Sequence, residues 1–174
     1  MMELNKVYFY TATIVEWKHL LKEQEYKDII INSLKHLSEK KLFKVYSFVI
    51  MPNHIHLIWH LTAMNGKEMP HASLMKFTSH QFLEKIRKEN PELLIDYQVQ
   101  SKNRIHQFWQ RDPMAIELYT RKVFEQKLNY IHNNPLQKRW CLVENAADYK
   151  YSSAKYYETE IDDFGILNHY AELF

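Results

Sequence analysis

The chain has 174 residues, 46% hydrophobic and 25% charged, with a net charge of +2; this balance suits one folded domain and excludes a disordered chain. Its single cysteine, Cys141, excludes an intrachain disulfide and a multi-cysteine zinc site, and its two glycines, Gly66 and Gly165, exclude a glycine-rich phosphate-binding loop. The sequence has no signal segment and no apolar run of roughly 18 residues, so we expect a cytoplasmic protein with no membrane partner.

The first third of the chain predicts a strand, a helix and two more strands. Residues 6–14 alternate β-branched and aromatic side chains, which indicates a strand. The apolar residues that follow have helical spacing and predict an amphipathic helix over roughly 25–40. Two further strands, 43–50 and 54–61, are joined by a tight turn at 51–53.

A second amphipathic helix is predicted over residues 71–89, and Asn90-Pro91 ends it. Residues 105–108 are the candidate for a short fourth strand. The resulting order, strand-helix-strand-strand-helix-strand, predicts an α+β protein of the ferredoxin-like type, with helices packed on an antiparallel sheet.

A third helix is expected to begin at Asp112, because an Asp cap followed by a proline, Pro113, is typical of a helix start. It would run to about Asn133 and be stopped by Pro135. For residues 136–174 we expect a strand or coil and a short final helical piece.

Charge is distributed unevenly along the chain. Residues 101–155 carry 10 basic and 5 acidic side chains, whereas residues 156–174 carry 5 acidic side chains and no Lys or Arg. This pattern suggests a polyanionic partner and a tail that covers the basic surface, although a solvated face with an ordinary acidic terminus explains it equally well. We therefore divide the chain into a domain, 1–157, and an acidic C-terminal tail, 158–174.

Two histidines occupy one face of the predicted third strand. Side chains alternate along a strand, so His54 and His56 point the same way, roughly 7 Å apart along the backbone. Ile55, Leu57 and Trp59 point the other way, toward a core. Neutral imidazole is a common metal ligand, so this pair predicts a metal site with two histidine ligands.

A tyrosine and an asparagine share one face at the end of the third predicted helix. Tyr130 and Asn134 are four residues apart, and Asn134 precedes a proline, where the helix must unwind. A tyrosine hydroxyl can act as a nucleophile. The amide and the two histidines could hold a divalent cation that polarises a phosphate oxygen.

These motifs together resemble a known family. The hairpin sequence MPNHIHLIWH resembles the histidine–hydrophobic–histidine motif of single-tyrosine transposases. YIHNNP, the following KRWCLVENAADYKYSSAKYY and the earlier FWQR resemble the REP-associated tyrosine transposases. The resemblance runs from about Lys6 to Tyr157, which is nearly the whole chain.

The resemblance implies a metal-dependent endonuclease and strand transferase that acts on single-stranded DNA, often beside a hairpin, through a 5′-phosphotyrosine intermediate. Tyr130 matches the nucleophile, and His54 and His56 match the metal-binding pair. Asn134 matches the third metal ligand, a position where related transposases often have glutamine. Two imidazoles and an amide oxygen leave open positions, which suits Mg²⁺ or Mn²⁺ better than structural zinc. Both a monomer and a homodimer fit this resemblance.

Cationic side chains and one tryptophan around these motifs are the candidate DNA contacts. Lysine and arginine supply most non-specific affinity for phosphates, and an aromatic ring can stack on a splayed base. The candidates are Arg111, Arg121, Lys122, Lys127, Lys138, Arg139 and, for stacking, Trp109.

Three rival functions remain open at this stage. A mobile-element transposase would use the same chemistry. A non-catalytic module that binds hairpin DNA or RNA would bind regardless of Tyr130 and of chelators. A structural metal protein would unfold on chelation, which an open two-histidine site should not do.

Overall fold

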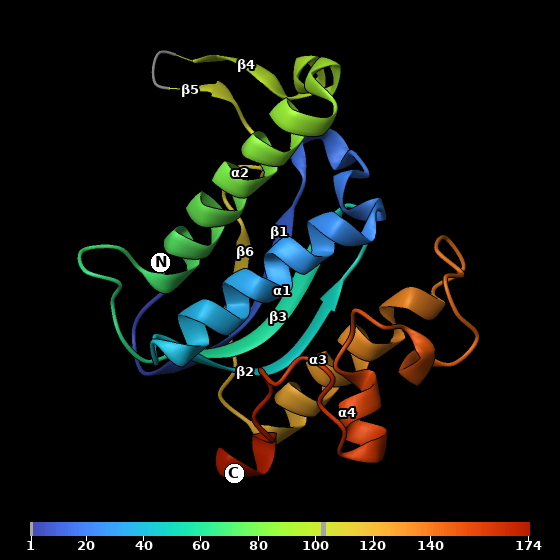
Figure 1. Cartoon of the computed structure of the whole chain (residues 1–174). Coiled ribbons are helices and arrows are strands. Elements are labelled where there is room, and N and C mark those ends of the chain that lie inside the picture. The colour runs from blue at the N-terminus through green and yellow to red at the C-terminus, as the bar shows by residue number, and fades with distance from the viewer. Residues whose placement is uncertain (1, 102–103) are drawn as a thin grey trace.

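A four-stranded antiparallel sheet forms the centre of the molecule (Figure 1). The computed structural model describes residues 2–101 and 104–174. The strands β1 (Lys6–Thr13), β2 (Phe43–Ile50), β3 (His54–Leu61) and β6 (Met114–Glu117) lie in the order β2-β3-β1-β6. β3 is therefore an inner strand, held by β2 on one side and β1 on the other. The predicted α+β, ferredoxin-like layout is confirmed.

Helices cover one face of the sheet. α1 (Gln24–Glu39) and α2 (Pro70–Glu89) lie side by side on it, and Tyr26 of α1 meets Phe82 of α2 at 5.7 Å between ring centroids. Both helices end within one residue of their predicted bounds, because amphipathic spacing is a strong signal in long elements.

The opposite face is covered by α3 (Arg121–Asn133), α4 (Ala154–Thr159) and the C-terminal residues. Neighbouring residues of β1 show the division between the two faces. Phe9 contacts Tyr130 of α3, with ring centroids 5.9 Å apart, whereas Tyr10 contacts His71 of α2 at 6.4 Å. Short 3-10 turns connect the elements: Val15–Trp17, Leu20–Lys22, Pro91–Tyr97, Asn134–Leu136, Ala146–Asp148 and Tyr170–Glu172.

The predicted start of the third helix is wrong. Asp112 has φ 58°, a left-handed conformation that cannot begin a helix, and residues Met114–Glu117 form strand β6 on β1. α3 starts eight residues later than Pro113, and its cap is Thr120, whose side chain accepts a hydrogen bond from the Val123 amide. Pairing with the open edge of β1 outweighs a local capping signal.

The predicted fourth strand is only partly right. Residues Arg104–His106 do form a strand, β5, but it pairs with β4 (Gln98–Ser101) in a separate two-stranded hairpin. The fourth strand of the main sheet is β6. The short β4–β5 hairpin extends beyond the end of the sheet, next to the C-terminal end of α2 (Figure 1).

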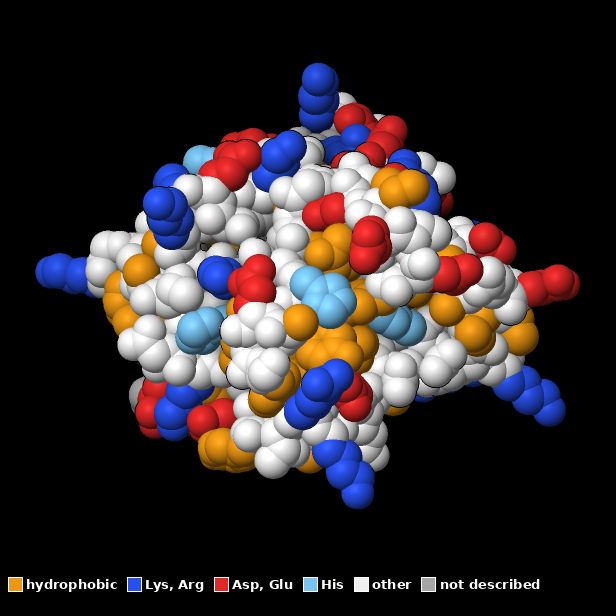
Figure 2. All heavy atoms as spheres, turned by 90° about the horizontal axis from the view of Figure 1, so that it is seen from below, with side chains coloured by type: hydrophobic (Ala, Val, Ile, Leu, Met, Phe, Trp, Pro, Cys, Tyr) orange, Lys and Arg blue, Asp and Glu red, His pale blue; other side chains and the backbone are white. Residues whose placement is uncertain are grey.

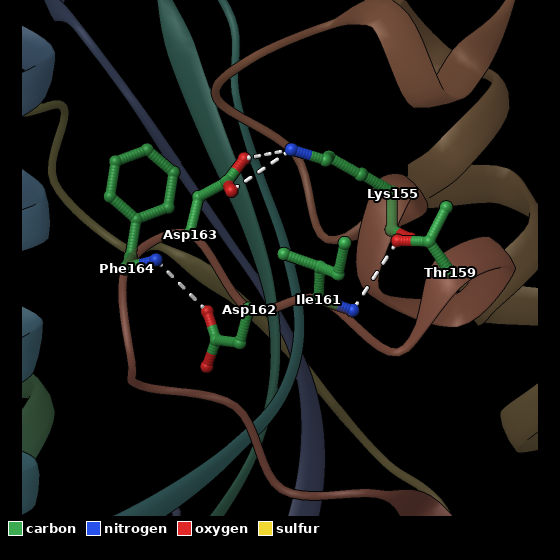
Figure 3. Close-up of polar contacts among 6 residues, drawn as sticks. All are labelled: Lys155, Thr159, Ile161, Asp162, Asp163 and Phe164. Carbon is green, nitrogen blue, oxygen red and sulfur yellow. Dashed lines mark hydrogen bonds and ion pairs between the residues drawn. The ribbon is translucent and has the colours of Figure 1, made fainter.

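The acidic C-terminal segment packs against the rest of the chain. Asp163 pairs with Lys155 at 2.8 Å, and Asp162 accepts a hydrogen bond from the Phe164 amide at 3.1 Å (Figure 3). Asp162 also accepts one from the Leu167 amide at 2.7 Å. Ile166 is buried, and the segment then runs along β2, where the Asn168 amide bonds to the Val45 carbonyl. The residues predicted as a tail therefore extend the packing of the sheet and α3.

Charge is mixed on the face near the C-terminus. Seen from below, a central group of hydrophobic and histidine side chains is surrounded by Lys and Arg interspersed with Asp and Glu (Figure 2). This face presents no continuous cationic surface. Within residues 2–101 and 104–174, no helix is both long and apolar enough to span a membrane.

Candidate active site

The two strand histidines lie on the α3 side of the sheet. His54 and His56 are 3% and 4% exposed, and their ring centroids are 4.7 Å apart. Both sit on β3 between two paired strands, so the backbone that holds them has little freedom. The face predicted for them is confirmed by their contact with α3, since the His56 ring meets Tyr130 edge-on at 5.3 Å.

Each histidine is oriented by a neighbour through its Nδ1 atom. Asn53 Oδ1 lies 2.6 Å from His54 Nδ1, and Thr11 Oγ1 lies 2.7 Å from His56 Nδ1. The Asn53 amide is itself fixed, because its Nδ2 donates to the Trp17 carbonyl at 3.1 Å. An amide oxygen only accepts, so His54 Nδ1 must carry the proton, and the lone pair of His54 is on Nε2. This is the outer-contact pattern of metal-binding imidazoles.

Burial keeps both imidazoles neutral. Desolvation lowers the pKa of His54 to about 4, with a smaller lowering effect from nearby Arg139 and a raising effect from Asn134. Desolvation likewise lowers the pKa of His56 to about 3, followed by the charges of His54, Arg139 and Lys127. Neutral imidazole is the form that binds a metal, so both rings are ready to do so at neutral pH.

Tyr130 and Asn134 reach the histidines from the end of α3. Tyr130 is 41% exposed, so its ring is open to solvent while it rests against His56. Asn134 is fully buried at the helix end, and neither atom of its amide has a hydrogen-bond partner among the described residues. The amide lies close enough to His54 to raise the pKa of that ring but does not meet hydrogen-bond geometry. The fold therefore brings the four predicted residues, His54, His56, Tyr130 and Asn134, close to one another.

The orphaned atoms of this set fit a divalent cation. His56 Nε2 and the Asn134 amide are buried and have no hydrogen-bond partner among residues 2–101 and 104–174. Both act on His54, and leaving such groups unsatisfied is costly unless a ligand binds them. No group of three or more His, Cys, Asp or Glu that could hold a metal occurs in the described part of the chain. An ion here would have two imidazoles, one amide oxygen and open positions.

Two of the predicted phosphate contacts lie at this site. The Lys127 ammonium is 4.8 Å from the centroid of the Phe9 ring and 5.9 Å from that of Tyr130. The Arg139 guanidinium lies 5.6 Å from the centroid of the Trp140 ring, and that ring is 5.9 Å from the His54 ring. Its charge lowers the pKa of His54 and of His56. Two positive charges therefore lie beside the candidate site.

The other predicted contacts lie elsewhere. Arg121 is in the first turn of α3, where it pairs with Glu125 at 2.8 Å, and Lys122 and Lys138 are exposed. Arg111 lines a groove beside α2. Trp109 is 6% exposed and its indole donates to Thr78 Oγ1 at 2.9 Å. The ring is mostly packed in the core and also belongs to the lining of this groove, so its stacking role stays a prediction.

Sequence reasoning assigned no role to the residues that support the site. Thr11 is directly opposite His56 in the β1–β3 register, and Phe9 stacks on the same ring at 5.3 Å. Strand register is a tertiary property, so no signal in the sequence pointed to Thr11. The position of Asn53 beside His54 was such a signal, but it indicates a turn equally well.

One comparison with a solved structure supports the fold. No protein-family model and no curated protein matches the sequence. A REP-associated tyrosine transposase solved bound to a REP hairpin is 17% identical, with a TM-score of 0.64 over 94% of this chain and 86% of that one. A putative transposase from Deinococcus radiodurans R1 is 14% identical, with a TM-score of 0.44 over 76% of this chain and 94% of that one. The resemblance inferred from the motifs is thus confirmed at the level of fold: this chain is folded like the REP-associated tyrosine transposase.

Proposed function

We propose that this protein is a metal-dependent endonuclease and strand transferase of single-stranded DNA, with Tyr130 as its nucleophile. The observation that carries the proposal is the contact between Tyr130 and His56. His56 Nε2 and the nearby Asn134 amide are buried and have no hydrogen-bond partner among the described residues. A purely structural role does not explain why the exposed Tyr130 packs against two neutral histidines that can bind a metal.

The reaction would be a transfer of the DNA phosphodiester to Tyr130. The tyrosine oxygen forms a bond to phosphorus and loses its proton to solvent, while the bond from phosphorus to the 3′-oxygen breaks and that oxygen takes up a proton. The product is a 5′-phosphotyrosine and a free 3′-hydroxyl. Attack by a second 3′-hydroxyl reverses the step and joins a new strand without ATP.

His54, His56 and Asn134 would hold Mg²⁺ or Mn²⁺. When bound, the cation would supply positive charge against a phosphate oxygen, a contribution of several kcal/mol. Lys127 lies one helical turn before Tyr130, and its ammonium is placed to neutralise the same phosphate. Phe9 and Thr11 keep the His56 ring in position.

The DNA partner is proposed to be single-stranded or hairpin DNA. This rests on the positive charges of Lys127 and Arg139 beside the site and on the similar fold of a transposase that was solved with a REP hairpin. Tyr130 and His56 of one chain are already in contact, so we propose cleavage in cis, which a monomer can perform.

A covalent-capture assay tests the proposal. The protein is incubated with single-stranded and hairpin DNAs and Mn²⁺ or Mg²⁺, and adducts are resolved on a denaturing gel and located by mass spectrometry. We expect an adduct on Tyr130 that disappears with Tyr130→Phe and with EDTA. Tyr119→Phe is the matched control, because Tyr119 is also exposed but bonds to Glu117. Metal-independent binding without any adduct would instead support a non-catalytic binding module.

A further inference from the structure

A groove of about 710 Å³ opens between α2 and residues 105–113. It lies on the α2 side of the sheet, whereas Tyr130 lies on the α3 side. Its volume is within the range of pockets that bind small organic groups. The groove is distinct from the candidate active site, since it contains neither the paired histidines nor any residue of α3.

The lining of this groove combines apolar side chains with positive charge. Met75, Leu83 and Phe108 are apolar lining residues, and Phe108 is otherwise buried in the core. Arg87 and Arg111 also line it, and neither makes an ion pair within residues 2–101 and 104–174.

The remaining polar groups of the lining are consistent with an anionic ligand. Lys76 is paired with Glu68 at 2.8 Å, and Asp112 is the single carboxylate of the lining. Three histidines also line the groove, and one of them, His71, has a buried Nδ1 with no hydrogen-bond partner in the described part of the chain. The lining thus holds two guanidiniums, Arg87 and Arg111, that form no ion pair among the described residues, and one carboxylate, Asp112. This excess of positive charge favours a ligand with negative charge.

We propose that this groove binds an unpaired nucleotide of the DNA strand. The base would rest on the apolar lining, and its phosphate would be held by Arg87 and Arg111. The proposal rests on DNA being the partner, as proposed above, but assigns a second contact region that cleavage itself does not require.

A second, smaller cavity adjoins the groove. This cavity of about 370 Å³ shares Gln107, Gln110 and Arg111 with the groove. Its other lining includes Glu16 and Lys18, which flank Trp17. The Trp17 carbonyl accepts the hydrogen bond of Asn53, the residue that orients His54. The smaller cavity therefore adjoins the backbone that supports Asn53 and His54.

Two neighbouring residues of α2 provide a matched test. Arg87 lines the groove, whereas Lys88, also basic and exposed in the last turn, does not. Arg87→Glu and Lys88→Glu change the net charge equally. Binding of a labelled single-stranded oligonucleotide is measured in EDTA on the Tyr130→Phe background. We expect Arg87→Glu to weaken binding about tenfold more than Lys88→Glu and to reduce the salt dependence by about one phosphate contact.

Several results would overturn the assignment. Equal losses in the two variants would leave only a general charge effect. A free deoxynucleotide that competes as well as the oligonucleotide would reassign the groove to mononucleotides. Photo-crosslinks from iododeoxyuridine in the oligonucleotide should fall on peptides from 71–87 or 105–113, and their confinement to α3 would also refute the proposal. Because binding is measured without metal and without Tyr130, the result does not depend on whether the protein cleaves DNA.

Discussion

The two faces of the sheet are organised by different physical means. On the α3 side, His54 and His56 are buried on an inner strand. The direction of each ring is fixed by a hydrogen bond, donated by His54 to Asn53 in one case and shared between His56 and Thr11 in the other. On the α2 side, the groove has an apolar lining and the guanidinium of Arg87. The first arrangement fixes the positions of the two imidazole rings closely, as a chemical reaction requires. The second provides a surface of suitable charge and shape, as binding requires.

Removal of a ring from the buried pair should have the largest effect. We expect His56→Ala to reduce adduct formation at least about 100-fold at saturating DNA, because one of two imidazole ligands is lost. DNA binding in EDTA should be nearly unchanged, since this residue is buried and does not supply charge. Rates of adduct formation from single turnovers measure the effect. Equal losses of binding and of cleavage would mean that the two faces are not separable.

Acid should destabilise the protein through its buried histidines. Burial lowers the pKa of His132 and of His54 to about 4 and that of His56 to about 3, whereas unfolded histidine titrates near 6.5. The unfolded chain therefore binds more protons below about pH 6.5, and this stability is lost as the pH falls toward about 4.

The free energy of unfolding should drop by several kcal/mol over that range, as measured by urea denaturation in EDTA. His132→Gln is the informative variant, because glutamine can still bond to Ser153, the partner of His132 at 2.9 Å. This variant should have a shallower pH dependence. The same steep curve in the variant would show that another group governs acid sensitivity.

The orientation of His56 by Thr11 can be tested separately from its presence. Thr11→Val removes the hydroxyl at 2.7 Å from Nδ1 with little change in volume. We expect metal affinity to fall about 10- to 100-fold, as for other outer contacts of metal-bound histidine. Activity should return at high Mn²⁺, and Thr11→Ser should behave like the wild type. Adduct yield against Mn²⁺ concentration gives the affinity, and a Val variant with unchanged affinity would rule out this role.

The difference between the two faces also explains what the sequence could predict. The strands 43–50 and 54–61, and hence the shared face of His54 and His56, follow from local periodicity, and the structure reproduces them. The groove depends on residues 105–113, near whose end Asp112 is left-handed, and the edge strand Met114–Glu117 follows where a helix was expected. Such features arise from tertiary pairing, which overrides a local cap. Thr11 was invisible for the same reason, because only strand register places it beside His56.

The α3 side has one more support, the C-terminal segment, whose removal should matter little to the groove. Asp162 accepts hydrogen bonds from two backbone amides, so Asp162→Ala should lower the free energy of unfolding by about 1–2 kcal/mol. Asp163→Ala removes only the exposed pair with Lys155 and should stay within about 0.5 kcal/mol. Thermal melts of the two variants compare them directly. Both variants should bind single-stranded DNA in EDTA equally well, because neither carboxylate lies near Arg87. If Asp162→Ala weakened that binding, the C-terminal segment would have to influence the opposite face of the sheet.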